Sequence, residues 1–213
     1  MSDTTLQVVD ELYSLVNSLP RMNHETPPDL LPENGIYVFF EAGEQVQWRE
    51  TTIARIVRVG THRENDRFRR RIRQHYGNVR SLRGNKNGSV FRKHMGGALL
   101  RRDNPGDPRL RDWLTQGGPS FHEVEERVSR RLRESFKFSC FEVNGREQRL
   151  ALERGLITLL AQNPIGQPSE DWLGRHANDE KIRRSHLWNT QHVDADPLTM
   201  AELEQLGTFT KGS

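Results

Sequence analysis

Two strand-like segments that lie close together in the chain constrain its fold more than any other feature. Gly35–Phe40 (GIYVFF) and Thr52–Val59 (TIARIVRV) are rich in β-branched and aromatic residues, and a turn is predicted between them at Ala42–Gly43. Neighbouring strands with a short connection pair in antiparallel fashion. A third segment of alternating character, Phe136–Val143, predicts another strand.

Helical periodicity covers much of the remaining sequence, so the expected fold class is α+β. A helix is expected in each of seven segments: Leu6–Leu19, Asp66–Tyr76, a segment that Ser89 caps, Leu110–Leu114, a segment that opens with a Ser120–Glu123 capping box, Leu152–Leu160 and Leu198–Leu206. In the second strand, Val57 and Val59 should share one face and Arg58 should point to the other.

The 213 residues suit one domain with elaborations. Residues 1–34 are expected to form an N-terminal helix and a proline-containing connector, residues 35–162 the core domain, and residues 163–213 a C-terminal extension packed on the core.

The charge is more informative in its distribution than in its total. The net charge is only +3, but arginines cluster between Arg55 and Arg111 and again between Arg127 and Arg133, which favours a polyanionic partner such as DNA. Cys140 is the only cysteine, which excludes an internal disulfide framework and suits the reducing cytoplasm. No apolar run approaches the roughly 18 residues that cross a bilayer, so we expect no membrane association.

Four short motifs occur in a fixed order. They are GIY at Gly35–Tyr37, a strand end at Arg58–Gly60, RIRQH at Arg71–His75 and LERGLI at Leu152–Ile157. Each is common by chance, but in this order they resemble the GIY-YIG nuclease family, over the region from Gly35 to about Leu160. The resemblance implies a small antiparallel β-sheet flanked by helices, here with extra helical segments at both ends.

The resemblance also implies a metal-dependent DNA endonuclease, with restriction or defence as a plausible role. Tyr37 would activate the attacking water, Arg71 would bind the scissile phosphate, and Glu153 would hold Mg²⁺ or Mn²⁺ near the leaving group. A guanidinium pairs with two phosphate oxygens, and carboxylate oxygens suit Mg²⁺. His75 lies one helical turn after Arg71, a spacing also found in restriction-enzyme members, and would support the site.

The second motif departs from the family pattern, because Arg58-Val59-Gly60 lacks the usual tyrosine. A cation beside Tyr37 would stabilise its phenolate and make it a better base. We therefore expect Arg58 to assist catalysis.

Segments outside the four motifs supply further expected contacts. Gly88–Arg102 and Ser185–Val193 resemble segments of a bacterial branch of the same family. Asn163, which precedes Pro164, stands in for an asparagine of the family, and His192 could complete the site. The expected substrate-binding residues are Arg92, Lys93, His94, Asn163 and Asn189.

Each of these residues also has a structural explanation. Tyr37 could be an ordinary strand aromatic, Arg71 a solvated charge, and Glu153 a first-turn carboxylate that the helix dipole favours. The rival functions are a catalytically inactive nucleic-acid-binding module on the same scaffold and a protein-interaction domain. A homodimer would suit double-strand cuts, since one such site cuts one strand at a time, but no sequence feature demands it.

Overall fold

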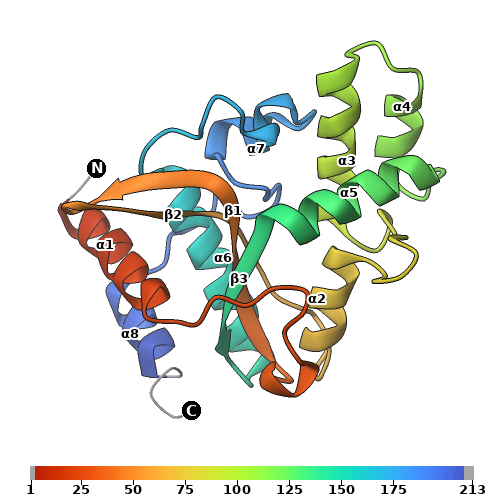
Figure 1. Cartoon of the computed structure of the whole chain (residues 1–213). Helices are drawn as coiled ribbons and strands as arrows, with labels where there is room; N and C mark the ends of the chain where they lie inside the picture. Colours follow the sequence, from red (N-terminus) through yellow and green to blue (C-terminus); the bar gives the residue numbers. More distant parts are fainter. Residues whose placement is uncertain (1–2, 209–213) are drawn as a thin grey trace.

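The computed structural model of the chain describes residues 3–208. In this range the sheet has three strands, β1 (Gly35–Trp48), β2 (Thr51–Gly60) and β3 (Phe136–Glu142), in the order β2-β1-β3 with both pairs antiparallel. Helices surround this small sheet (Figure 1). The expected α+β class is therefore confirmed.

Seven of the eight α-helices in residues 3–208 overlap the predicted segments. The helices are α1 (Asp3–Asn17), α2 (Phe68–Tyr76), α3 (Val90–Asp103), α4 (Arg109–Leu114), α5 (His122–Ser135), α6 (Arg146–Gln162), α7 (Glu180–Ser185) and α8 (Met200–Thr208), with short 3₁₀ helices η1 (Pro28–Leu30) and η2 (Leu173–His176). Of these α-helices, α7 was not predicted. Ser89 caps α3 as predicted, because its side chain accepts a hydrogen bond from the Arg92 amide. Within residues 3–208, no helix is long and apolar enough to cross a bilayer.

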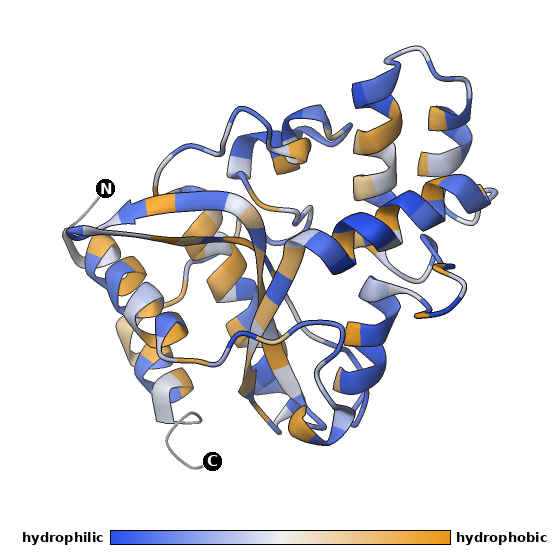
Figure 2. Ribbon diagram, in the orientation of Figure 1, coloured by the Kyte–Doolittle hydropathy of each residue, from blue (hydrophilic) through white to orange (hydrophobic). Residues whose placement is uncertain are grey.

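The hydrophobic residues form two clusters, one on each face of the sheet. The first joins the sheet to α1, α6 and α8, and the second joins it to α2, α3 and α5 (Figure 1). Because successive side chains of a strand point to opposite faces, Ile36 and Val38 enter the first cluster and Tyr37 and Phe39 the second. In β3, hydrophobic and hydrophilic residues alternate from Phe136 to Cys140, and Phe141 then interrupts the alternation (Figure 2). Tyr37 therefore points to the α2 side of the sheet.

β1 continues through Ala42–Gly43, so the predicted turn there was wrong. The pairing with β2 shifts between Phe40 and Gln45, and Gly43 has a φ of +86°. A glycine with positive φ serves a β-bulge as readily as a turn. The chain reverses instead after Trp48, where Arg49 has a φ of +51°.

A second irregularity changes the predicted alternation in β2. The pairing shifts beside the Phe39–Arg58 pair, and Val57 has no partner in β1. Val57 packs in the same cluster as Phe39, whereas Val59 packs in the opposite one. The guanidinium carbon of Arg58 lies 4.9 Å from the centre of the Phe91 ring. A bulge thus turns Val57 and Arg58 to the same face, and the predicted opposition of these two residues was wrong.

Two details of the helix starts also differ from prediction. α5 has no side-chain cap, because Ser120 donates its hydroxyl to the Glu125 carboxylate at 2.9 Å in place of a capping box with Glu123. α6 begins at Arg146, so Glu153 lies in its middle. The first-turn explanation of Glu153 therefore does not apply.

Candidate active site

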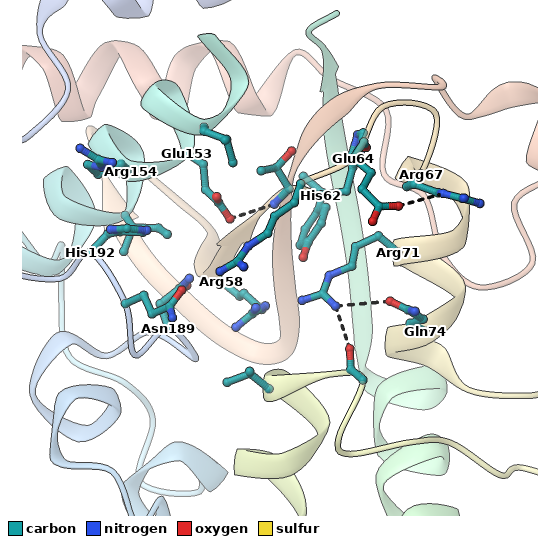
Figure 3. A pocket seen from close by; sticks show the side chains of 18 of the residues that line it. Arg58, His62, Glu64, Arg67, Arg71, Gln74, Glu153, Arg154, Asn189 and His192 are labelled. Atoms are coloured by element: carbon teal, nitrogen blue, oxygen red, sulfur yellow. Dashed lines mark hydrogen bonds and ion pairs between the residues drawn. The ribbon is translucent and has the colours of Figure 1, made fainter. Parts of the chain in front are cut away.

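A pocket of about 840 Å³ lies where the end of β2, α2, α6 and the segment after α7 meet (Figure 3). Its charged lining residues, apart from histidines, are Arg58, Arg63, Arg67, Arg70, Arg71, Arg146, Arg154, Glu64 and Glu153. Arginines thus outnumber carboxylates by seven to two. Such an excess of positive charge in a concave site favours a polyanion such as a nucleic acid backbone.

Tyr37 forms part of the pocket wall, with its hydroxyl bound to a histidine. Its Oη lies 2.7 Å from Nε2 of His75, and Nδ1 of His75 lies 2.9 Å from Oγ of Ser89. Burial, with the charge of Arg71 nearby, lowers the pKa of His75 well below its usual value. The imidazole is therefore neutral near pH 7, and in the tautomer that carries the proton on Nε2 it donates to Tyr37. Tyr37 is 0% exposed, so its hydroxyl lies deep in the wall.

Gly60 makes room for this hydroxyl. It pairs with Tyr37 across β1 and β2, and a Cβ added to Gly60 would lie 2.2 Å from the Tyr37 oxygen. Real Cβ atoms do not approach that closely. A tyrosine in this position thus requires a glycine opposite it.

Arg58 lies near Glu153 in the pocket (Figure 3), and it interacts electrostatically with both Tyr37 and Glu153. Its Nη1 donates to the carbonyl oxygen of Trp188, and its exposed fraction is 6%. Burial lowers the pKa of Arg58, whereas Tyr37 and Glu153 act to raise it. The cation is therefore placed to stabilise negative charge on either group.

Arg71 points into the pocket from α2, across from Glu153 (Figure 3). Its Nη1 donates to Oε1 of Gln74 at 3.3 Å and to the carbonyl oxygen of Gly88 at 2.9 Å. Within the described residues, Nε and Nη2 of Arg71 make no hydrogen bond. These two nitrogens can therefore pair with a phosphate while Nη1 keeps the side chain in place.

Glu153 lies on the opposite wall, on α6. Its Oε1 accepts a hydrogen bond from the Thr61 amide at 2.9 Å, and the Thr61 hydroxyl donates to the carbonyl oxygen of Gly35 at 2.6 Å. Burial raises the pKa of Glu153, and the charge of Arg58 opposes this. The carboxylate is thus tied to the ends of both β1 and β2.

A divalent cation would have Glu153 as its protein ligand. No group of three or more His, Cys, Asp and Glu side chains suited to a metal occurs among residues 3–208. Mg²⁺, however, commonly uses one or two carboxylates and completes its shell with water and substrate phosphates. In the described part of the chain Oε2 of Glu153 accepts no hydrogen bond, so the residues present fit a cation shared between Glu153 and a bound phosphate.

The segment after α7 forms a further wall of the pocket. The Asn189 side chain donates to the carbonyl oxygen of Val59 at 2.9 Å and accepts a hydrogen bond from the backbone amide of Val59 at 3.1 Å. The backbone amide of Trp188 donates to the carbonyl oxygen of Val57 at 2.7 Å. The segment thereby pairs with the β2 edge that β1 leaves free. Asn189 and His192 both line the pocket, although the amide of Asn189 is engaged with backbone.

Arg92 lies outside the pocket, contrary to the expected contact with DNA. It is 0% exposed, its guanidinium pairs with the Glu125 carboxylate at 2.6 Å, and it donates to the carbonyl oxygen of His75 at 2.8 Å. A buried guanidinium that is paired in this way has no face for a phosphate. The structure gives Arg92 the role of holding α2, α3 and α5 together.

The other three expected substrate contacts do not line the pocket either. Lys93 is half-buried, and its carbonyl oxygen accepts a hydrogen bond from Trp113. His94 is 9% exposed, and burial lowers its pKa to about 4. Asn163 ends α6, where its side chain donates to the carbonyl oxygen of Leu159.

Sequence reasoning missed several arginines that line the pocket. Arg146 and Arg154 belong to α6, as Glu153 does, Arg70 belongs to α2, and Arg67 precedes α2 as its N-cap residue. Arg67 lies four residues before Arg71 and Arg146 lies seven residues before Glu153, so helical spacing would have found these two. Arg70 and Arg154 directly adjoin a motif residue and carry no such signal. Arg63 lies between β2 and α2, where no periodicity could indicate its direction.

Comparisons with known proteins gave one result. A family model described as a GIY-YIG domain matches residues 2–211. No curated protein and no solved structure matches the chain. The matched region includes both α1 and α8, and it is longer than the region in which the four motifs lie.

Proposed function

Because the chain belongs to the GIY-YIG domain family, we propose that it is a nuclease that hydrolyses phosphodiester bonds of DNA with the help of Mg²⁺ or Mn²⁺. One observation carries the proposal: Tyr37, Arg71 and Glu153, from three separate elements, line a single pocket. The arginine-rich lining supports a phosphate backbone as the substrate.

The proposed roles follow from the contacts of each side chain. Arg71 pairs with the scissile phosphate, and the buried charge of Arg58 offsets the negative charge that develops during attack. Tyr37 acts in its phenolate form, which the charge of Arg58 and a hydrogen bond from Nε2 of the neutral His75 stabilise, and it becomes a phenol when it accepts the proton of the attacking water. Glu153 holds the cation, which when bound supplies positive charge at the leaving oxygen.

Nicking of supercoiled plasmid DNA in the presence of Mg²⁺ tests the proposal. We expect the wild type to nick, and Tyr37→Phe to reduce the rate at least about 100-fold, since general-base catalysis contributes roughly 10²–10⁴. Glu153→Gln should abolish nicking, because it removes the carboxylate that would hold the cation. Tyr13→Phe is a matched control, because Tyr13 is also buried and hydrogen-bonded but lies outside the pocket. Equal rates for the wild type and both site variants would contradict the proposed chemistry.

A catalytically inactive nucleic-acid-binding module is the second candidate. Two observations favour it: Tyr37 is 0% exposed, and an arginine occupies the position of the usual second tyrosine. This candidate predicts salt-sensitive DNA binding without nicking in Mg²⁺ or Mn²⁺. The same plasmid assay, combined with a binding measurement, therefore separates the two functions.

A further inference from the structure

A second pocket, of about 630 Å³, adjoins the candidate active site. It is lined by the segment around His24–Leu31, by α2 and by the loop between α2 and α3. Arg70, Gln74 and Gly88 line both pockets. The two pockets are thus separated by a wall only a few side chains wide.

The second pocket has an aromatic and aliphatic lining. The rings of His24 and Tyr76 lie with their centres 5.7 Å apart, and Leu31 and Ile72 contribute aliphatic atoms. Val79, one of the few large hydrophobic residues that are exposed, stands at 69% exposure in its lining. A surface of this kind suits a planar, weakly polar group.

The charged residues around this pocket are mostly cations. Four arginines line it, Arg69, Arg70, Arg73 and Arg133, against one glutamate, Glu25. Burial lowers the pKa of His24, so the imidazole is neutral near pH 7. In the described part of the chain its enclosed Nδ1 has no hydrogen-bond partner. An occupant should therefore combine a flat ring with a nearby negative charge.

We propose that the second pocket binds an unstacked nucleobase of the strand whose phosphate lies in the candidate active site. The inference takes its substrate from the proposed function. A nucleotide joins a planar base to an anionic phosphate, which matches an apolar pocket beside an arginine-lined one. The volume is within the range of small-molecule sites. Because a base must leave its stack to enter, DNA with an unpaired nucleotide should bind better than perfect duplex.

The wall between the pockets connects the base to the phosphate ligand. Arg71 donates to Gln74 and Gly88, which are two of the three residues that both pockets share. A base that packs against this wall would hold Gln74 and Gly88 in the positions that fix Arg71. The second pocket is therefore suited to positioning the substrate.

A double-mutant cycle tests the proposal, with the base removed from the DNA as one change and the His24 side chain removed from the protein as the other. Binding is measured with EDTA present, so that no cleavage occurs, on a duplex with a one-nucleotide bulge and on the same duplex with an abasic site at the bulge. We expect the wild type to bind the bulged base about tenfold more tightly, which corresponds to about 1.4 kcal/mol. His24→Ala should lose this preference, whereas Leu6→Ala, an exposed position on α1, should keep it.

The preference is a ratio within each protein, so a partly unfolded His24→Ala sample lowers both affinities and leaves the ratio unaffected. A wild-type ratio near one, or an unchanged ratio in His24→Ala, would overturn the proposal. If the protein nicks DNA but shows no preference for the bulged base, the proposed nuclease function stands and the proposed base pocket is wrong. If the preference exists and His24→Ala removes it, but no cation supports nicking, the base pocket stands and the nuclease function is wrong.

Discussion

At the scale of single residues, the candidate site is built from groups whose charges are set by burial. His75 is kept neutral beside Tyr37, and Glu153 is a carboxylate that burial disfavours. An ionised Glu153 favours function over stability, because burial disfavours its charged form, whereas the neutral form of His75 is the one that burial favours. Sequence indicated these residues through the motif order, but their burial depends on elements far away in the chain.

Glu153→Gln should stabilise the protein near pH 7 while it abolishes nicking. The folded state raises the pKa of Glu153, so its charged form is penalised once the pH exceeds the unfolded value of about 4.5. Gln removes that charge and keeps an oxygen for the Thr61 amide. We expect the Tm to rise by about 2–4 °C, the shift that ~1 kcal/mol produces in a chain of this length.

The stabilisation should disappear below about pH 4.5, where Glu153 is protonated in both the folded and the unfolded state. Thermal unfolding as a function of pH measures this. A Tm at pH 7 below that of the wild type would show that the attraction to Arg58 outweighs the burial.

At the scale of strands and helices, local irregularities of the backbone orient the side chains of the candidate site. The bulge at Val57 turns Arg58 toward the pocket, and the segment after α7 covers the edge of β2. The periodicity of the sequence predicted the strands, but a single extra residue in a strand leaves no mark in an alternating pattern. The alternating pattern therefore placed Arg58 and Val57 on opposite faces of the sheet, whereas the bulge puts them on the same face.

Gly60→Ala should impair both stability and activity, because the added methyl group would meet the Tyr37 hydroxyl. Overpacking of this kind costs about 1–3 kcal/mol. Gly145→Ala is the control, since its Cβ would have only ordinary contacts. Urea unfolding and plasmid nicking check the prediction, and wild-type nicking by Gly60→Ala would contradict the proposed position of Tyr37.

Arg92→Ala should destabilise the protein by about 3–5 kcal/mol, because it leaves the buried carboxylate of Glu125 without its cation. The exposed Arg102–Asp103 pair provides the control, and Arg102→Ala should cost less than about 1 kcal/mol. Urea denaturation measures both. A small effect of Arg92→Ala together with weaker DNA binding would restore the expectation that Arg92 contacts DNA.

At the scale of the whole molecule, two clusters of hydrophobic residues sandwich a small sheet, and the arginines divide into two kinds. Some, such as Arg92, hold helices together from inside, and others line the pocket. Sequence shows only that arginines are abundant. Whether one of them faces solvent or a carboxylate such as Glu125 depends on contacts between distant segments. The fold and the core of the candidate site were therefore predictable, and the other arginines that line the pocket were not.

DNA binding should weaken steeply with salt, and the pocket arginines should account for the slope. Arg154→Ala should reduce the slope of log K against log salt by about one. Arg109→Ala should not, since Arg109 lies outside the pocket and pairs with Asp107 and Glu123. Binding titrations at several salt concentrations measure the slopes, and equal slopes for all three proteins would place the DNA elsewhere.

A crystal structure of Tyr37→Phe with DNA and Mn²⁺ would show where the cation and the phosphate bind, because manganese is located by its anomalous scattering. We expect one manganese peak beside the Glu153 carboxylate, with the scissile phosphate between it and the guanidinium of Arg71. A DNA backbone that crosses another face of the protein, or a manganese peak away from Glu153, would contradict it.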